Sequence, residues 1–415
     1  MLLQLRESAK GQGSFCVPRT AIQALLDNKA TAYEICTYLV LAKHTDASGL
    51  YSTASVKAVN KATGANKTRG GPVDRAIARL MKIRVLEAVN SPSGGRARSQ
   101  TSPAQATDRG PILIDRATWV QDTGELLPDG PTERGKVRFI LPGFDEDPLE
   151  RVWISSNLVA GIGAMTQPLK ALKNAGDVAA RLLLSMYAAN DMENWGGVRP
   201  VGEGCGPWKH YEPVAESSDL KGNCRLLRAK DSGKIVSLDQ RINGGDVVAF
   251  WQALEALESI GLIYEVVMVL NRAAKPAKFS NGAEYGAIPD DAEPYYELDV
   301  RSRHGYKPDG EEGLGGATAT TARDLGEPVA NRNGVLDGTY AAIVPAGFSA
   351  MIAGIYRLRF RVANSKNVGV SGAWARIRQN NRDALGLVER ARKANNLLAL
   401  AAPGSQARQP PRAQA

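Results

Sequence analysis

The stretch that most constrains the fold of this chain is PVDRAIARLMK, at Pro72–Lys82, because a helix made from it has two chemically opposite faces. At about 100° per residue, its apolar side chains fall on one line and its cations cluster about half a turn away. The two sets are Val73, Ile77 and Leu80 on the apolar line, and Arg75, Arg79 and Lys82 on the cationic side. One face requires a core to cover it, and the other favours an anion.

The segments on either side predict a helix-turn-helix followed by a hairpin. Upstream, residues 52–64 have a short helical pattern that ends at Gly64, a residue that can take the left-handed conformation of a helix C-terminus. Downstream, residues 84–89 form a β-prone run, and a loop rich in Ser, Pro, Gly and Arg then leads to a second apolar run at residues 111–114. The expected hairpin therefore has a basic tip.

A further helix is expected before these elements, at residues 31–45. Thr31 and Glu34 have the spacing of a capping box, in which each side chain bonds the other residue's backbone N–H. The expected buried face of this helix consists of Ile35, Cys36, Leu39, Val40 and Ala42.

This order of helices and strands, over residues 20–115, resembles the winged helix-turn-helix DNA-binding domains of bacterial regulators and of plasmid and phage replication initiators. One departure is visible, since seven residues, 65–71, separate Gly64 from Pro72, where about three or four are usual. The resemblance implies that the helix at Pro72–Lys82 lies in the major groove of double-stranded DNA, where arginine can read guanine through paired hydrogen bonds.

The resemblance also assigns roles to the cations around that helix. Arg75 and Arg79 are the candidates for base contact, with Lys82 on the same face. Four further cations would lie near the phosphate backbone, and two at the wing tip would enter a minor groove or touch phosphates. These six residues are Lys57, Lys61, Lys67, Arg69, Arg96 and Arg98. The alternative interpretation is an ordinary solvated helix face and an exposed loop.

Charge is distributed unevenly along the 415 residues, whose net charge is +9. Residues 1–110 hold 16 Lys and Arg against 7 Asp and Glu, and residues 351–415 hold 12 against 2. Residues 111–350 hold 24 against 34. Two basic ends therefore flank an acidic middle, and a polyanion is expected to bind at the ends.

Residues 165–302 predict a second, degenerate winged-helix unit with inserted loops. When residues 255–266 are aligned with residues 78–89, apolar side chains fall at matching positions. A loop at 271–292 then precedes a returning strand at 295–300. The helix expected at 246–260 has a core face of Val247, Phe250, Trp251, Leu254 and Leu257. Its opposite face consists of Ala249, Gln252, Ala253, Ala256 and Ser259, and none of these residues is a cation. This copy therefore suits homodimerisation or packing between domains better than base reading.

The remaining segments have weaker patterns. Residues 195–243 read as loops and short strands, and residues 303–338 as a Gly-rich linker. Residues 355–362 alternate strictly, so Arg357, Arg359 and Arg361 share one face of a strand, where they would contact phosphates or form salt bridges to the acidic middle. A helix at 372–398 follows, with an apolar stripe that includes Trp374, Ile377, Leu385 and Val388.

Several classes of function are disfavoured. With three histidines and no HExxH, GxSxG or GxxxxGK[ST] motif, the chain is not expected to be an enzyme or to need a cofactor. The four cysteines lack CxxC pairing, and Cys205, His210 and Cys224 lack a fourth metal ligand, so reduced thiols and no metal are expected. No apolar run is long enough to span a membrane and the start lacks a signal peptide, which predicts a cytoplasmic protein.

These observations predict an α+β protein of tandem winged helix-turn-helix units with a C-terminal basic strand-helix region. The expected segments are a DNA-binding domain at 1–115, connecting strands and loops at 116–164, the second unit at 165–302, the linker at 303–338, the basic region at 339–401 and a disordered tail at 402–415. The expected function is sequence-specific binding of double-stranded DNA in transcriptional regulation. The alternatives are a replication initiator at repeated origin sites and an assembly protein that binds nucleic acid without sequence preference.

Overall fold

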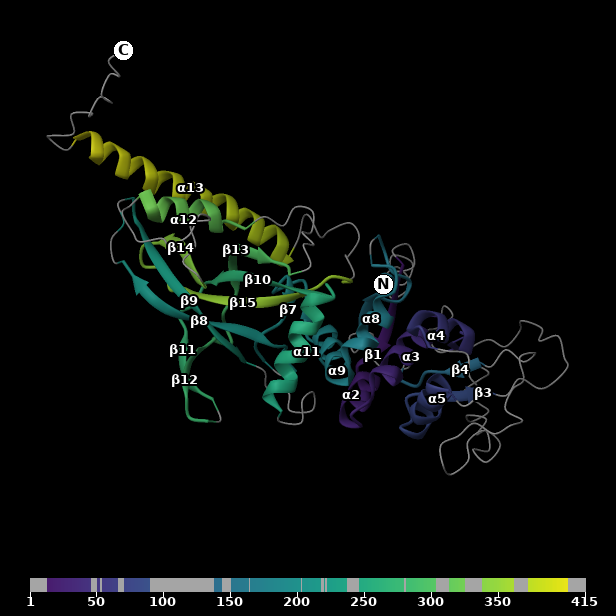
Figure 1. Cartoon of the computed structure of the whole chain (residues 1–415). Coiled ribbons are helices and arrows are strands. Elements are labelled where there is room, and N and C mark those ends of the chain that lie inside the picture. Colours follow the sequence, from purple (N-terminus) through teal and green to yellow (C-terminus); the bar gives the residue numbers. More distant parts are fainter. Residues whose placement is uncertain are drawn as a thin grey trace, which may run out of the picture.

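The chain has a mixed α+β architecture in which an N-terminal group of helices adjoins a six-stranded antiparallel sheet (Figure 1). A computed structural model describes residues 13–45, 51–52, 54–65, 71–89, 138–143, 151–163, 165–202, 204–217, 220, 222–236, 246–279, 281–303, 313–324, 338–361 and 372–401. We call residues 14–188 the helical unit and residues 190–401 the sheet unit.

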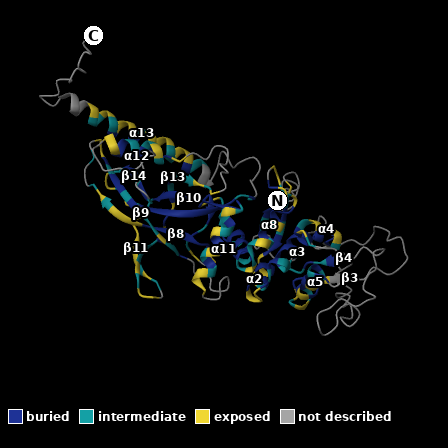
Figure 2. Ribbon diagram, viewed as in Figure 1, coloured by how far each residue is buried: buried dark blue, intermediate teal, exposed yellow. Residues whose placement is uncertain are grey.

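The helical unit is built around one helix, α3, whose side chains are buried on almost every side (Figure 2). Helices α4, α5, α8 and α9 and strand β1 all pack against it. The elements of this unit are β1 (Ser14–Pro18), α2 (Arg19–Asp27), α3 (Ala32–Lys43), β2 (Tyr51–Ser52), α4 (Val56–Thr63), α5 (Pro72–Lys82), β3 (Glu87–Val89), β4 (Arg138–Ile140), β5 (Arg151–Ser155), α7 (Asn157–Ala160), α8 (Pro168–Ala175) and α9 (Asp177–Ala188).

The start of α3 confirms the predicted capping box. The Thr31 backbone N–H donates to Glu34 Oε2 at 2.9 Å, and the Glu34 N–H donates to Thr31 Oγ1 at 3.3 Å. All five side chains of the predicted face are buried, and so are Tyr38 and Leu41 on other sides of the helix. An apolar helix of this kind is stable only when neighbours surround it.

Both helices of the predicted helix-turn-helix are present, and a small sheet follows them. The bounds of α5 match the predicted helix, and Gly64 ends α4 in the left-handed conformation, with φ 64°. Strands β2, β4 and β3 lie in that order in an antiparallel sheet. The partner of β3 is β4, in which Phe139 is buried. The predicted partner, residues 111–114, lies outside the described residues. The helical unit thus continues past residue 115, the boundary expected from the sequence.

The sheet unit has the strand order β13-β10-β15-β8-β9-β14, with every neighbouring pair antiparallel. Side chains join its two edge strands, since Tyr296 Oη donates to the Ile343 carbonyl at 3.0 Å and Tyr340 Oη donates to Asp299 Oδ2 at 3.2 Å. Its elements are β6 (Asn190–Asp191), β7 (Gly197–Val198), β8 (Trp208–Glu216), β9 (Cys224–Val236), α11 (Val247–Ser259), β10 (Ile263–Leu270), β11 (Lys275–Lys278), β12 (Glu284–Ala287), β13 (Pro294–Arg301), α12 (Gly315–Asp324), β14 (Thr339–Pro345), β15 (Met351–Leu358) and α13 (Gly372–Ala401).

The second winged-helix unit expected from the sequence is not confirmed by this sheet. Strand β10 follows α11 and pairs with β13 as expected, but its other edge pairs with β15, so the two strands belong to a larger sheet. The expected loop between them contains the β11–β12 hairpin. The segment expected to hold loops and short strands, 195–243, supplies the long strands β8 and β9. Register shifts between those strands interrupt the alternation that would have marked them.

Part of the predicted linker is a helix packed against the sheet. In α12 the residues Thr318, Ala319, Thr321 and Ala322 are buried, and α12 contacts β14 and α13 (Figure 1). Threonine hydroxyls in α12 donate to backbone carbonyls one turn earlier, as Thr318 Oγ1 does to the Leu314 carbonyl at 2.6 Å. The prediction of a linker over residues 303–338 was therefore wrong for α12, because small Ala and Thr side chains allow close packing.

The face assigned to α11 was also partly wrong. Val247 and Val248 are 63% and 65% exposed, whereas Ala253, predicted for the opposite face, is buried with Phe250 and Leu254. The helix packs against α9 of the helical unit. Of the two roles predicted for α11, the structure shows packing between the units. Homodimerisation stays a prediction.

The predicted arginine ladder is not a free cationic face. Arg357 is 1% exposed, forms an ion pair with Glu297 and donates from Nε to the Gly196 carbonyl at 2.6 Å. Strand β15 ends at Leu358, so Arg359 and Arg361 follow the strand instead of extending it. Both faces of β15 are buried, and the strict alternation therefore did not mark a solvent-facing side. For Arg357, the salt bridge to the acidic middle of the chain is the correct alternative.

The C-terminal helix forms as predicted, with a changed apolar stripe. In α13, Ile377 and Val388 are buried as expected, but Leu385 is 40% exposed and Leu387 faces the core in its place. The Trp374 side chain lies outside those that the structure describes. Of the helices described, none combines the length and the apolar character needed to cross a bilayer.

The substitution Arg357→Ala tests whether this side chain stabilises the sheet unit. It leaves the Glu297 carboxylate buried without its cation, so we expect the free energy of unfolding in urea to fall by about 3–5 kcal/mol. Arg382→Ala, on an exposed position of α13, is the control and should change the value by less than about 0.5 kcal/mol. Equal effects of the two substitutions would contradict a structural role for Arg357.

Candidate nucleic-acid interface

The two faces predicted for Pro72–Lys82 are present on α5. Proline occupies the first turn of the helix, where its missing N–H costs no hydrogen bond. The apolar line is buried and packs toward α3, whereas Arg75, Arg79 and Lys82 are exposed. Arg79 and Lys82 also lie in the last turn, where cations interact favourably with the helix dipole. The buried line thus fixes the direction in which the three cations point.

The cations of α5 differ in their partners from several arginines of the sheet unit. Within the described part of the chain, no carboxylate forms an ion pair with Arg75, Arg79 or Lys82. In the sheet unit, by contrast, two exposed arginines near strands β10 and β13 are paired: Arg272 with Asp291, and Arg303 with Glu255 and Glu258. The charge on α5 is therefore available to an external anion.

Helix α4 places two more predicted cations at the surface. Its N-cap Ser55 accepts the Ala58 N–H at 3.2 Å, and Lys57 and Lys61 are exposed. At its other end, a Cβ on Gly64 would lie 2.8 Å from Cδ of Lys170 in α8. The left-handed backbone favours glycine at position 64, and the Lys170 side chain would have to move to admit a Cβ there.

Arg84 is an exposed cation that the sequence analysis had placed in a strand. It follows α5 with a φ of 62°, in the left-handed region that glycine usually occupies. The Arg84 N–H bonds the Met81 carbonyl at 3.1 Å, and the Val85 N–H bonds the Leu80 carbonyl at 3.2 Å. These two bonds form a Schellman motif, whose left-handed position is strained for arginine. The strand itself begins only at Glu87.

The end of α11 has the same motif with glycine at the equivalent position. Gly261, with φ 71°, bonds the Glu258 carbonyl at 3.0 Å, and the Leu262 N–H bonds the Leu257 carbonyl at 3.0 Å. The overlay of residues 255–266 on 78–89 places Gly261 on Arg84. The two segments therefore share a helix end and a following strand, and only the one at α5 carries a cation at the strained position.

Four of the predicted DNA-contact residues lie outside the described residues. They are Lys67 and Arg69 in the turn, and Arg96 and Arg98 at the wing tip. The structure thus assigns an exposed position to Lys57, Lys61, Arg75, Arg79 and Lys82, and adds Arg84 to them.

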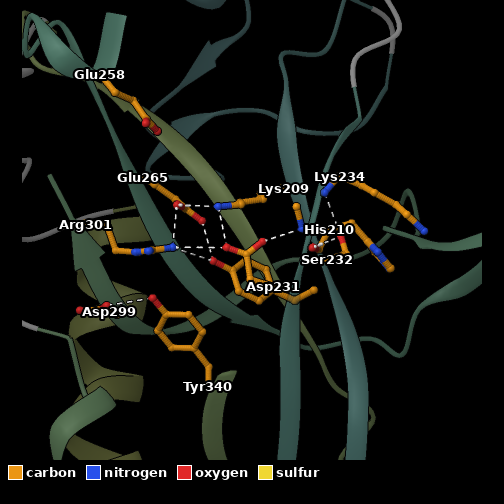
Figure 3. Close-up of polar contacts among 12 residues, drawn as sticks. Lys209, His210, Asp231, Ser232, Lys234, Glu258, Glu265, Asp299, Arg301 and Tyr340 are labelled. Carbon is orange, nitrogen blue, oxygen red and sulfur yellow. Dashed lines mark hydrogen bonds and ion pairs between the residues drawn. The ribbon is translucent and has the colours of Figure 1, made fainter. Parts of the chain in front are cut away.

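A second group of charges, missed from the sequence, lies on the curled sheet (Figure 3). The Glu265 carboxylate is 4% exposed; it accepts Tyr211 Oη at 2.8 Å and faces Arg301 at 3.4 Å and Lys209 at 3.8 Å. Lys209 Nζ also lies 2.6 Å from Asp231. Burial and the Glu265 carboxylate raise the pKa of Tyr211, which keeps its hydroxyl protonated as a donor. The one sequence signal was a lone Glu within the apolar run IYEVVMVL.

This group can form because strand β15, which separates β10 from β8, has a glycine at the crossing point. A Cβ on Gly354 would lie 2.3 Å from Glu265 Oε1 and 2.9 Å from Lys209 Cβ. Without that Cβ, the two charged side chains meet across the strand. Each carboxylate has a cation beside it, so the group is balanced and ties strands together instead of attracting an anion.

His210 lies next to this group and holds the β11–β12 hairpin. It is 2% exposed, and its Nε2 accepts the Gly286 N–H of β12 at 3.0 Å. Burial lowers the pKa of His210. Cys205 and Cys224, considered with it as metal ligands, are not in a disulfide. Among the described residues, no three His, Cys, Asp or Glu side chains are placed to hold a metal ion.

Comparison with family models, with curated proteins and with solved structures finds no match for this chain. The functional assignment therefore depends on the geometry of the site alone.

Exchanging residues at the two Schellman motifs tests the strain at Arg84. Arg84→Gly should raise the free energy of unfolding by up to about 1 kcal/mol, because glycine takes the left-handed conformation without a steric cost. Gly261→Arg should lower it by about the same amount. Both values come from urea denaturation. A loss of stability in Arg84→Gly would show that the arginine side chain itself stabilises the fold.

A pH titration tests the role of His210. Because burial lowers its pKa in the folded state, the unfolded chain takes up the proton first, near the ordinary pKa of 6.5. The stability that neutral His210 contributes should be complete above that pH and decrease as the pH falls below it. Urea denaturation between about pH 5 and 8 should show a smaller pH dependence in His210→Gln than in the native chain. Identical dependences would contradict this expectation.

Proposed function

We propose that the helical unit binds double-stranded DNA with α5 in the major groove, and that the protein is a sequence-specific transcriptional regulator. The observation that carries the proposal is the face of α5: three exposed cations without a carboxylate partner among the described residues, held in place by a buried apolar line. Arginine is suited to this task because its guanidinium group can donate two hydrogen bonds to one guanine.

The order of elements supports the same proposal. Helix α3, strand β2, helices α4 and α5 and strands β3 and β4 follow one another as in the winged-helix domains that the sequence resembles. In that arrangement, Arg75 and Arg79 contact bases, and Lys57 and Lys61 contact phosphates. Arg84, in the turn between α5 and the wing, adds a further cation, and its strained backbone favours a functional reason for the residue.

In this proposal, the sheet unit contains a second winged helix that does not contact DNA bases. We propose that α11, β10 and β13 correspond to a degenerate second winged helix, since α11 ends in the same motif as α5 and leads into a strand. Two arginines near these elements, Arg303 and Arg357, are held in ion pairs. The exposed Val247 and Val248 would lie in the interface if two copies of the chain pair through this unit.

Selection of bound fragments from random duplex DNA, followed by a salt titration, separates the regulator from its alternatives. A palindromic sequence would favour a dimeric regulator, repeated direct sites would favour a replication initiator, and equal affinity for scrambled DNA would favour an assembly protein. If about six phosphates are neutralised, the logarithm of affinity should fall with the logarithm of salt concentration at a slope near −5. A flat salt response would overturn DNA binding.

Substitutions on α5 test base contact directly. Arg75→Ala and Arg79→Ala should each cost roughly 1–3 kcal/mol on the selected site and relax its specificity. Lys57→Ala should weaken all sequences alike and reduce the salt slope by about 1. Arg382→Ala, an exposed arginine on α13, is the control. Unchanged binding in both α5 variants would remove α5 from the interface.

A further inference from the structure

We propose that helix α8 extends the DNA-binding surface of the helical unit, and that its residues Lys170 and Lys173 bind phosphates of the duplex outside the bases that α5 reads. Neither lysine stands out in the sequence, because both are far along the chain from the cations of α4 and α5. The inference rests on the proposed function and adds a contact surface to it.

Helix α8 adjoins the cationic helices because it packs against α4, which also packs against α5 (Figure 1). Helices α4 and α8 both contact α3 as well. In α8 the buried residues are Pro168, Leu169 and Leu172, whereas Lys170 is exposed and Lys173 half-buried. The packing that covers α3 therefore brings the lysines of α8 beside those of α4.

The contact at Gly64 shows how close the two sets of lysines lie. A Cβ on Gly64 would lie 2.8 Å from Cδ and 3.1 Å from Cε of Lys170, so the lysine stem crosses the bare backbone at the end of α4. Lys61 lies one turn before Gly64, and Lys57 one turn before Lys61. Lys173 follows Lys170 by one turn of α8. We call Lys57, Lys61, Lys170 and Lys173 the lysine group.

No carboxylate neutralises the lysine group among the residues that the structure describes. Neither α4 nor α8 contains Asp or Glu, and none of the four lysines forms an ion pair with another described residue. Two carboxylates at neighbouring helix ends have backbone partners instead. Glu34 accepts the Thr31 N–H at 2.9 Å, and Asp177 accepts the Ala32 N–H at 2.8 Å.

The chemistry of the group favours the phosphates of a nucleic acid. Neighbouring cations without counter-charges repel one another, and a bound polyanion relieves that repulsion. Lys173 Nζ lies 5.2 Å from the centre of the Tyr33 ring, a contact that positions the ammonium and supplies no counter-charge. The cations of α4 and α8 are all lysines, whereas the arginines are on α5. Lysine holds phosphates as a point charge and arginine reads bases, so the helices divide these two tasks.

Salt titrations of duplex binding by the full chain test the contacts of α8. The probe is the DNA sequence selected by the native chain, extended by about 10 base pairs, one helical turn, on each side. Lys170→Gln and Lys173→Gln should each weaken binding roughly fivefold and reduce the salt slope by about 1, while the preferred sequence stays the same. Lys393→Gln removes the same charge from an exposed position of α13 and should change neither quantity.

Thermal unfolding in low salt separates a lost contact from a lost fold. Because removal of one cation relieves repulsion within the lysine group, neither α8 variant should melt below the native chain. An altered sequence preference in either variant would contradict a contact to phosphates alone.

Comparison with Arg75→Ala and Arg79→Ala separates this inference from the proposed function. If the α5 variants relax specificity and the α8 variants keep the native affinity and slope, the inference is wrong and the proposed function stands. If the α8 variants weaken binding and lower the slope while the α5 variants have no effect, α8 binds phosphates and only the proposed function is overturned. A flat salt response of the native chain would overturn both.

Discussion

The burial of α3 on almost every side is the constraint on which the helical unit depends. A helix with Ile35, Tyr38, Leu39 and Leu41 facing different directions is unstable in water until neighbours cover each side. Helices α4, α5, α8 and α9 and strand β1 provide that cover. Each of these neighbours packs its apolar side against α3, so its polar side faces outward. The cationic face of α5 is a consequence of this packing.

The strands of the sheet unit and the helices of the helical unit hold charged groups differently. The sheet unit buries charged groups and pairs them, as with Arg357 and Glu297, or Glu265 with its cations. Such pairs specify which strands lie together, because a buried charge without its partner is costly. The helical unit leaves cations exposed on α4 and α5. The exposed cations of α4 and α5 are among those that we propose for DNA contact.

Sequence reasoning worked where the determining interactions are local. The capping box of Thr31 and Glu34, the glycine that ends α4 and the two faces of α5 all depend on residues within a turn or two of one another. It failed where the partner is distant. Strand β3 pairs with residues 138–140, Arg357 with Glu297, and α12 with a strand and a helix beyond it. Arg84 was missed because an arginine in a glycine conformation has no sequence signature.

The sequence by itself determined helices α3, α4 and α5 and the residues that α5 presents on each face, because helical periodicity fixes which side chains lie together. Only the tertiary structure decided where each of the other cations lies. A strand's alternation does not say whether its second face meets water or another layer, so Arg357, Arg359 and Arg361 looked equivalent in sequence. Folding placed the first in a buried ion pair and the other two beyond the end of the strand.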